Sequence, residues 1–350
     1  MNIKNRLIKT ATLLIVLQLV LSLNSVSGEA TDLELTLSFT NLGDPGDDHY
    51  EGWLIVDGSP VSTGKFSLDA NGGIVDLSGT AITTFSVSAI DLELATKFVL
   101  SLEPMGDTDT VPAAIKPLAG DLNVAKTSST LTPNLGVDLG TVAGSYILAT
   151  PTNDPVTNEN SGIWFLDPTG TDPVAGLTLP DLTGTDWTYE GWVVMNGTPV
   201  TTGTFDTVAG VDASAPYSGT QAGPPFPGED FLDNAPTGLT FPTDLSGMTA
   251  VISIEPRIDN AASPFQFKPL MGAIPVDAID HTLYALHDMS STLAAGTVSI
   301  AEVTSETTST TSTTPAATTS QSTDDDSPGF GLALISLSFF TILVVKRKNN

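Results

Sequence analysis

Short apolar runs separated by turn residues dominate the middle of the chain. Between residues 31 and 303, runs of four to seven apolar or β-branched residues alternate with glycine, proline, aspartate and asparagine. This spacing is typical of strands joined by tight turns, and no stretch there has the apolar period of a long helix. The pattern therefore predicts an all-β fold.

The clearest predicted element is a hairpin that occurs twice. The run from Trp53 to Val56 is apolar throughout and is followed by Asp57-Gly58, and the run from Trp192 to Met195 is followed by Asn196-Gly197. A two-residue hairpin turn favours these dipeptides because both of its central positions have positive φ. Strands that are apolar on both faces are usually buried between layers, so each first strand is predicted to be central in its sheet.

Both hairpins belong to a longer repeat. Tyr50-Glu51-Gly52-Trp53 is matched by Tyr189-Glu190-Gly191-Trp192, and the offset is 189 − 50 = 139. The segment from Pro60 to Phe66 is matched by Pro199 to Phe205 at the same offset, so two copies of one unit are the simplest explanation. We interpret the shared residues as structural, with the tryptophans as core anchors: Trp53, Gly64 and Phe66 in the first copy, and Trp192, Gly203 and Phe205 in the second.

A second pair of matches shows where the copies differ. Val99 to Pro104 is matched by Val251 to Pro256, and here the offset is 152, so the second copy has gained 152 − 139 = 13 residues. The gain falls in the segment from Ala215 to Gly247, which is rich in proline, glycine and aromatic residues. This composition predicts a long surface loop, and loops carry much of the binding in proteins. The segment is the predicted recognition surface.

The repeat divides the chain into parts. We predict two tandem, related β-sandwich-like domains at residues 29–127 and 128–303, the second with its long loop at 215–247. Residues 1–28 have the basic start, apolar centre and small residues of a signal peptide, which places the mature chain outside the cell. Residues 304–327 form a stalk rich in threonine, serine and aspartate, and residues 328–350 form an apolar tail that ends in Lys346-Arg347-Lys348. Such a tail predicts a membrane segment whose basic end is cytoplasmic.

The tail resembles a known sorting signal. Pro328, Gly329 and Phe330 open an apolar stretch with a short basic end after a Thr-rich linker, and this arrangement is similar to the archaeal PGF-CTERM signal. The resemblance implies that a processing enzyme of the archaeosortase type removes the tail and that the new end is joined to a lipid. A plain membrane anchor is the alternative. Either route holds the protein at the outer surface.

Charge and cysteine content exclude several classes of function. All 40 acidic residues and six of the 12 Lys and Arg residues lie between the signal and the tail, so this part carries 6 − 40 = −34 formal charges. A surface so negative excludes nucleic acid as a natural partner. Cysteine is absent from the sequence, which rules out disulfides, thiol nucleophiles and zinc-thiolate sites.

The order of the repeated blocks resembles that of a known domain family. A Tyr-x-Gly-Trp strand, a glycine hairpin, Pro-Val-x-x-Gly-x-Phe and a later Glu-Pro strand are similar to the C-terminal extracytoplasmic domain of anti-sigma-K factors of the RskA type. The resemblance covers about residues 33–124 and 146–303 and implies a β-rich module outside the membrane. Only Lys346 to Asn350 follow the apolar stretch, so we expect no cytoplasmic domain that could hold a sigma factor.

The sequence lacks the residue constellations of common enzymes. Its three histidines, His49, His281 and His287, have no Gly-x-Ser-x-Gly motif near them, and surface histidines beside acids are common without any catalytic role. Glu103 and Glu255 precede proline at matching places in the two copies. We expect each to accept hydrogen bonds from a turn, or to pair with the lysine of its own copy, Lys116 or Lys268. No catalytic residue is predicted.

Two small motifs are typical of a ligand site and of a modification site. Asp44, Asp47 and Asp48 cluster around a glycine turn, and three hard oxygen donors could bind calcium, although a solvated acidic loop explains them as well. Asn196-Gly197-Thr198 is a glycosylation sequon that coincides with the second hairpin turn.

The predicted function is therefore a surface-anchored, non-catalytic binding or envelope-structural module that recognises an unknown extracellular ligand. One alternative is a sensor of the anti-sigma type that acts with a separate membrane partner. A second alternative is a surface hydrolase, which would need acids clustered in a cleft.

Overall fold

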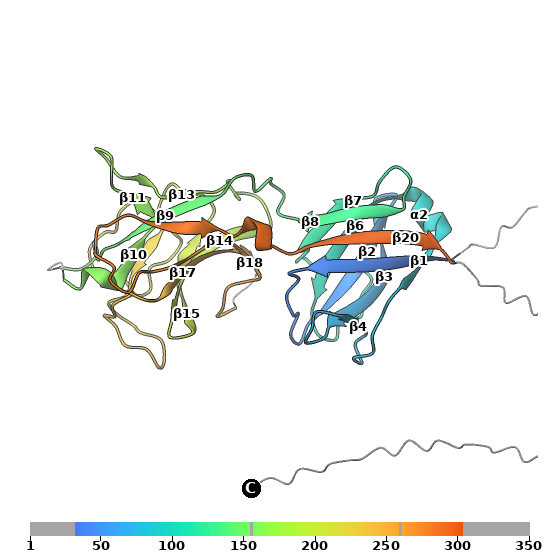
Figure 1. The fold of residues 1–350 in the computed structure, drawn as a ribbon, viewed down its shortest axis with the longest axis horizontal. Coiled ribbons are helices and arrows are strands. Elements are labelled where there is room, and N and C mark those ends of the chain that lie inside the picture. The colour runs from blue at the N-terminus through green and yellow to red at the C-terminus, as the bar shows by residue number, and fades with distance from the viewer. Residues whose placement is uncertain (1–31, 155–156, 259–260, 304–350) are drawn as a thin grey trace, which may run out of the picture. The chain divides into compact units, whose positions relative to one another are not determined.

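A computed structural model describes residues 32–154, 157–258 and 261–303 of the chain (Figure 1). The predicted all-β fold is confirmed, because nearly every element is an antiparallel strand. In the described residues the helical elements are α2 (Ala89–Leu94) and two 3-10 turns, η1 (Glu159–Ser161) and η2 (Ser290–Thr292). None of these helices is long and apolar enough to cross a membrane.

The strands form two large sheets. The first has the order β4-β3-β2-β6-β7-β8-β20-β1-β5. Its strands are β1 (Asp32–Thr40), β2 (His49–Val56), β3 (Ser59–Leu68), β4 (Ile74–Val75), β5 (Phe85–Ser88), β6 (Ala95–Glu103), β7 (Leu118–Asp121), β8 (Ser128–Pro133) and β20 (Ala295–Glu302).

The second sheet has the order β15-β14-β17-β18-β19-β9-β10-β16, and β13 also pairs with β9. Its strands are β9 (Ala143–Leu148), β10 (Gly162–Trp164), β13 (Leu177–Thr178), β14 (Trp187–Met195), β15 (Thr198–Phe205), β16 (Gly228–Asp230), β17 (Thr249–Pro256), β18 (Phe267–Ala273) and β19 (Tyr284–Asp288). A small separate ladder joins β11 (Leu166–Asp167) to β12 (Val174–Ala175).

Two strands contradict the predicted boundaries, which assigned residues 128–303 to the second domain, because β8 at the start of that range and β20 at its end both lie in the first sheet. β20 lies between β8 and β1 in the first sheet, where Val298 pairs with Leu37 and with Ser129 (Figure 1). In the sequence, all strands of the second sheet therefore lie between β8 and β20, which are neighbours in the first sheet. The alternating burial of β20 was readable from the sequence, but its partners were not, because a strand's pattern does not say which edge it will join.

Both predicted hairpins are confirmed. Asp57 and Gly58 have φ of 47° and 78°, and Asn196 and Gly197 have φ of 53° and 85°. All four values are positive, as a two-residue turn of this twist requires. The strand before each turn, β2 or β14, lies inside its sheet with a neighbour on either side, and its residues are mostly buried.

The repeat is confirmed as a shared local topology. The order β3-β2-β6-β7 in the first sheet is matched by β15-β14-β17-β18 in the second. Each hairpin even carries an irregularity at the same place, between Gly52 and Trp53 and between Gly191 and Trp192. The same sequence blocks therefore build the same four-stranded framework twice.

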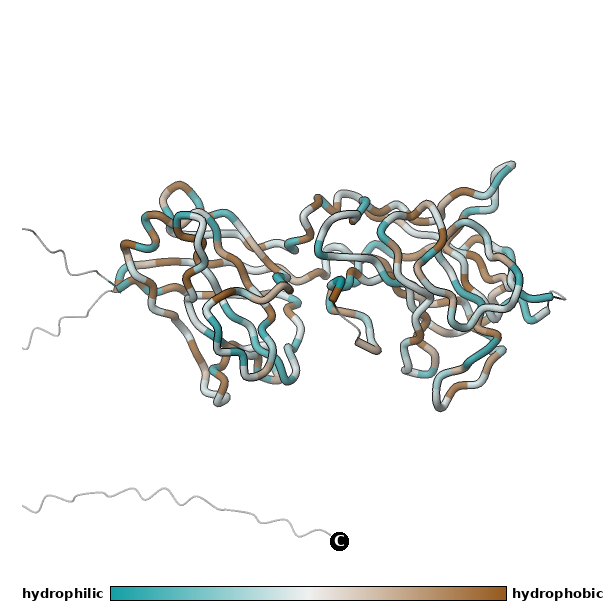
Figure 2. Tube along the Cα trace, turned by 180° about the vertical axis from the view of Figure 1, so that it is seen from behind, coloured by the Kyte–Doolittle hydropathy of each residue, from teal (hydrophilic) through white to brown (hydrophobic). Residues whose placement is uncertain are grey.

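Apolar side chains fill the interior along these frameworks. Figure 2 shows apolar and polar stretches spread over both sheets. In the first sheet the fully buried residues include Tyr50, Leu54, Phe66, Phe98 and Leu100, and in the second sheet they include Tyr146, Tyr189, Ile252, Phe267 and Leu270.

Candidate functional site

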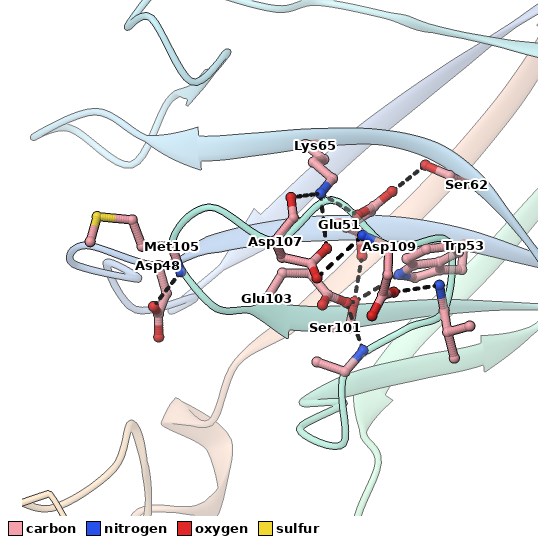
Figure 3. A network of polar contacts seen from close by, with 12 residues as sticks. Asp48, Glu51, Trp53, Ser62, Lys65, Ser101, Glu103, Met105, Asp107 and Asp109 are labelled. Carbon is pink, nitrogen blue, oxygen red and sulfur yellow. Dashed lines mark hydrogen bonds and ion pairs between the residues drawn. The ribbon is translucent and has the colours of Figure 1, made fainter.

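A polar frame supports the repeated tryptophan in the first sheet (Figure 3). Trp53 Nε1 donates to Ser101 Oγ at 2.7 Å, and the Ser101 hydroxyl donates to the Glu103 carboxylate. Glu103 Oε1 also accepts the backbone N–H of Ala113 at 2.8 Å, which ties down the loop after β6. A buried indole, hydroxyl and carboxylate are thus all satisfied by one another.

The second sheet repeats this frame. Trp192 Nε1 donates to Ser253 Oγ at 2.8 Å, Ser253 donates to Glu255, and Glu255 Oε1 accepts the N–H of Phe265 at 2.8 Å. Trp53 is 1% exposed and Trp192 is 3% exposed, so both tryptophans are buried, but neither belongs to the main core cluster. Trp53 packs in a small cluster with Val99 and Ala119, separate from the main core.

Of the two roles predicted for Glu103 and Glu255, the hydrogen bond from a turn is confirmed. The lysines bind elsewhere, because Lys116 Nζ donates to the Ala113 carbonyl and Lys268 Nζ to the Phe265 carbonyl, each at 2.7 Å. The polar groups of each frame are thus bonded to one another and to the backbone.

The copies differ at the glycine of the second hairpin strand. A Cβ at Gly64 would lie 2.8 Å from the Phe85 ring, whereas a Cβ at Gly203 would lie 2.7 Å from the Asp212 carboxyl carbon. Phe85 belongs to β5 and packs against Phe66 with ring centroids 5.9 Å apart. The first copy therefore covers this position with an aromatic ring, and the second copy covers it with a carboxyl group.

The segment from Ala215 to Gly247 is more than the surface loop that its composition predicted. It contains β16, an edge strand whose three residues are buried and which pairs with β10. Its aromatic side chains also pack on one another, since the ring centroids of Tyr217, Phe231 and Phe241 lie 5.4–5.8 Å apart. The sequence could not show this, because a three-residue strand rich in glycine and acid has no apolar pattern.

One hollow of about 310 Å³ lies where this segment meets the rest of the second sheet. Its walls include Trp164, Asp212, Ser218 and Gln221. Trp164 Nε1 donates to Asp230 Oδ1 at 2.7 Å behind this wall. Sequence reasoning missed this pair, because Trp164 is not repeated in the first copy and Asp230 is distant in sequence.

Three carboxyl groups lie beside this hollow, and two of them are fully buried. Glu229 and Asp230 are fully buried, and Asp212 is half-buried and accepts the N–H of Gly228 at 3.0 Å. Burial raises the pKa of Asp212 to about 7, and burial together with the charges of Asp212 and Asp230 raises the pKa of Glu229 to about 8. Burial also raises the pKa of Asp230.

Glu229 is only partly satisfied. Ser218 donates a hydrogen bond to Glu229 Oε1, but Oε2 is buried and has no hydrogen-bond partner among the described residues. An ionised carboxylate in that state is costly, so a protonated Glu229 fits its surroundings near neutral pH.

A second, more polar hollow of about 510 Å³ lies at one end of the second sheet. Three carboxylates, Glu159, Asp244 and Asp280, line it together with Asn160. His281 stands next to it, with Nδ1 3.2 Å from Asp280 Oδ1 and Nε2 3.9 Å from Glu159 Oε2. We call this feature the Asp244 hollow. Asp244 belongs to segment 215–247, so this segment contributes walls to both hollows.

Other predicted residues are not brought together. His49 is buried and His287 is exposed on β19. Asp44 Oδ1 accepts the N–H of Gly46 at 2.9 Å, and Asp48 Oδ1 accepts the N–H of Met105 at 3.0 Å (Figure 3). Across the described ranges no group of three or more acidic or histidine side chains is arranged to hold a metal ion. Calcium binding by Asp44, Asp47 and Asp48 stays a prediction.

The sorting motif Pro328, Gly329 and Phe330, the signal peptide and the stalk lie outside the described residues. Comparisons of the chain with protein-family models, with characterised proteins and with solved structures gave no match. The resemblances to the anti-sigma-K ectodomain and to the PGF-CTERM tail therefore stay predictions.

Proposed function

We propose that this protein is a binding or envelope-structural module held at the outer cell surface, and that it recognises its ligand through the second sheet. The observation that carries the proposal is the position of segment 215–247. This segment distinguishes the second copy from the first, and it contributes walls to both hollows. The polar groups of the frames around Trp53 and Trp192 bond to one another. Segment 215–247 differs between the copies, so we assign ligand recognition to it.

The surface location rests on the two ends of the chain and on charge. A signal-like start, an apolar tail with a basic end and −34 formal charges between them favour an extracellular ectodomain on a membrane or lipid anchor. Protease added to intact cells is the direct test. We expect degradation of the ectodomain without cell lysis, and protection until lysis would contradict the proposed location.

The chemistry of the Asp244 hollow narrows the ligand class. Glu159, Asp244 and Asp280 offer acceptors and negative charge, and Asn160 adds an amide. Such walls favour a ligand with cationic or many hydroxyl groups and disfavour an anionic one. Cell-envelope glycans and basic peptide segments have these properties.

Binding of the purified mature chain to isolated cell envelopes tests the recognition surface. The variant Asp244→Ala/Asp280→Ala removes two charges from the hollow. The matched control Glu34→Ala/Glu93→Ala removes two exposed charges from the first-sheet region. We expect the hollow variant to bind at least tenfold more weakly and the control to bind like the unaltered chain. Equal binding by all three proteins would place recognition elsewhere.

A surface hydrolase is a second candidate, because Asp280, His281 and Glu159 gather at the Asp244 hollow. A carboxylate beside a histidine can orient it as a general base. Hydrolysis of envelope glycans or peptides that is lost in His281→Asn would favour this candidate. The sensor of anti-sigma type stays a third possibility, which requires a separate membrane partner.

A further inference from the structure

The turn between β14 and β15 exposes a modification motif. β14 ends at Met195 and β15 begins at Thr198, so Asn196 and Gly197 form the tip of the hairpin. Asn196, Gly197 and Thr198 are all exposed. Asn196-Gly197-Thr198 is also the one Asn-x-Ser/Thr triplet in the whole sequence. The motif is thus unique in the chain and fully accessible.

The side-chain amide of Asn196 is free to react. Five other asparagines donate their Nδ2 groups to neighbouring oxygens, namely Asn123, Asn153, Asn158, Asn160 and Asn234. Within the described part of the chain Asn196 makes no such bond. A Cβ placed on Gly197 would meet no atom within 4 Å, so the space around the tip is open.

The first copy shows that the turn does not need asparagine. Its hairpin has Asp57-Gly58-Ser59 at the matching place, with φ of 47° at Asp57 and 78° at Gly58. The two tips therefore share one backbone geometry, and an aspartate is sufficient for it. The chemical difference between the copies is an amide nitrogen in the second and a carboxylate in the first.

We propose that Asn196 is the attachment site of an N-linked glycan, an inference that rests on the proposed extracellular location of the chain. The donor would be a glycan joined to a lipid through phosphate. Asn196 Nδ2 bonds to the anomeric carbon of the first sugar, and the bond from that carbon to the phosphate oxygen breaks. The lipid phosphate leaves with the electron pair, and the amide loses one proton, so no oxidant or reductant is involved.

The glycan would stand at a definite end of the second sheet. Val194, two residues before Asn196, pairs with Thr249, and Thr249 follows Asp244 by five positions. The modified turn is therefore at the end of β14 that adjoins the segment carrying Asp244.

Peptide mass spectrometry of the full chain from its own cells tests the site. Cleavage after Glu190 and Asp206 releases residues 191–206, a peptide that contains the turn and no other acidic residue. We expect this peptide to carry an added glycan mass. The mass should disappear in Asn196→Gln and Thr198→Val and persist in Thr198→Ser, which keeps the motif.

The first copy supplies a gain-of-site control. The double variant Asp57→Asn/Ser59→Thr gives the first turn the same triplet, and its peptide, residues 52–69, should then gain a glycan. Suppose that protease added to intact cells degrades the ectodomain but the 191–206 peptide carries no glycan. That result would overturn this inference and leave the surface location intact. Glycosylated Asn196 with a bare Asn at position 57 would refute the claim that the exposed turn is sufficient.

Discussion

The two copies of the repeated unit share their support and differ in what covers it. In each, a buried tryptophan, serine and glutamate connect the central strand, β2 or β14, to the loop that follows its neighbour in the sheet, β6 or β17. Over the matching glycine, the first copy places the ring of Phe85 and the second places the carboxyl of Asp212. We infer from this contrast that the duplicated residues stabilise the fold, and that ligand recognition depends on the unshared residues around segment 215–247.

Loss of a repeated tryptophan is the strongest way to probe the shared support. Trp53→Ala and Trp192→Ala each remove a buried ring and leave a serine without its donor, so we expect each to lower the free energy of unfolding by about 3–5 kcal/mol. Chemical denaturation measures both values. A large loss for one variant with almost none for the other would show that the frames are not equivalent.

The buried acids should make stability depend on pH in the second copy. The folded pKa values of Asp212 and Glu229 are about 7 and about 8, and the unfolded values are near 4. Between about pH 4 and pH 8 the folded state therefore binds more protons than the unfolded state. Their contribution is complete below about pH 4 and is lost as pH rises towards 8. At ~1.4 kcal/mol per unit of pKa, each rise of about three units corresponds to a loss of up to about 4 kcal/mol, and to less for Asp212 because it is only half-buried.

Thermal unfolding between pH 5 and pH 9 checks this expectation. The variant Asp212→Asn/Glu229→Gln should show a clearly flatter decline in Tm than the unaltered chain. The matched control Phe85→Leu, at the equivalent position of the first copy, should lower Tm without changing the slope. An unchanged slope in the acid variant would mean that these groups do not titrate as their burial implies.

The serine of each frame gives a smaller effect. Ser101→Ala and Ser253→Ala leave an indole N–H and a buried carboxylate without one partner, which costs about 1–3 kcal/mol in each copy. Ser101→Thr, which keeps the hydroxyl, is the control for the first copy. Denaturation midpoints that stay unchanged in both alanine variants would remove the frame from the account of stability.

The smallest effect is expected at the site where the copies differ by one charge. Lys65 Nζ lies 3.4 Å from Glu51 Oε2 and 3.1 Å from Asp107 Oδ2, whereas the second copy has Thr204 in place of the lysine. Lys65→Thr should destabilise the chain by about 1 kcal/mol, because the Lys65 ammonium is partly exposed to solvent. Thr204→Lys should change stability by less. A loss above about 3 kcal/mol in Lys65→Thr would mean that this ion pair is structural.

The sequence predicted those features whose signal is local. The all-β class, the Asp57-Gly58 and Asn196-Gly197 turns and the central position of β2 and β14 follow from residue pattern and turn chemistry. The return of β20 to the first sheet was missed, because partner choice depends on chain course. The buried acids were missed for the same reason: Asp212 and Glu229 meet only after segment 215–247 folds against β15 and β10.

Hydrogen exchange of the tryptophan indoles tests most directly whether each copy is stabilised by its own frame of the same design. The Nε1–H groups of Trp53 and Trp192 are each bonded to a buried serine. Nuclear magnetic resonance of indole-labelled protein, assigned with Trp53→Phe and Trp192→Phe, reports each group separately. We expect both indoles to be strongly protected and each serine variant to expose only the tryptophan of its own copy. Rapid exchange of either indole in the unaltered chain would contradict this expectation.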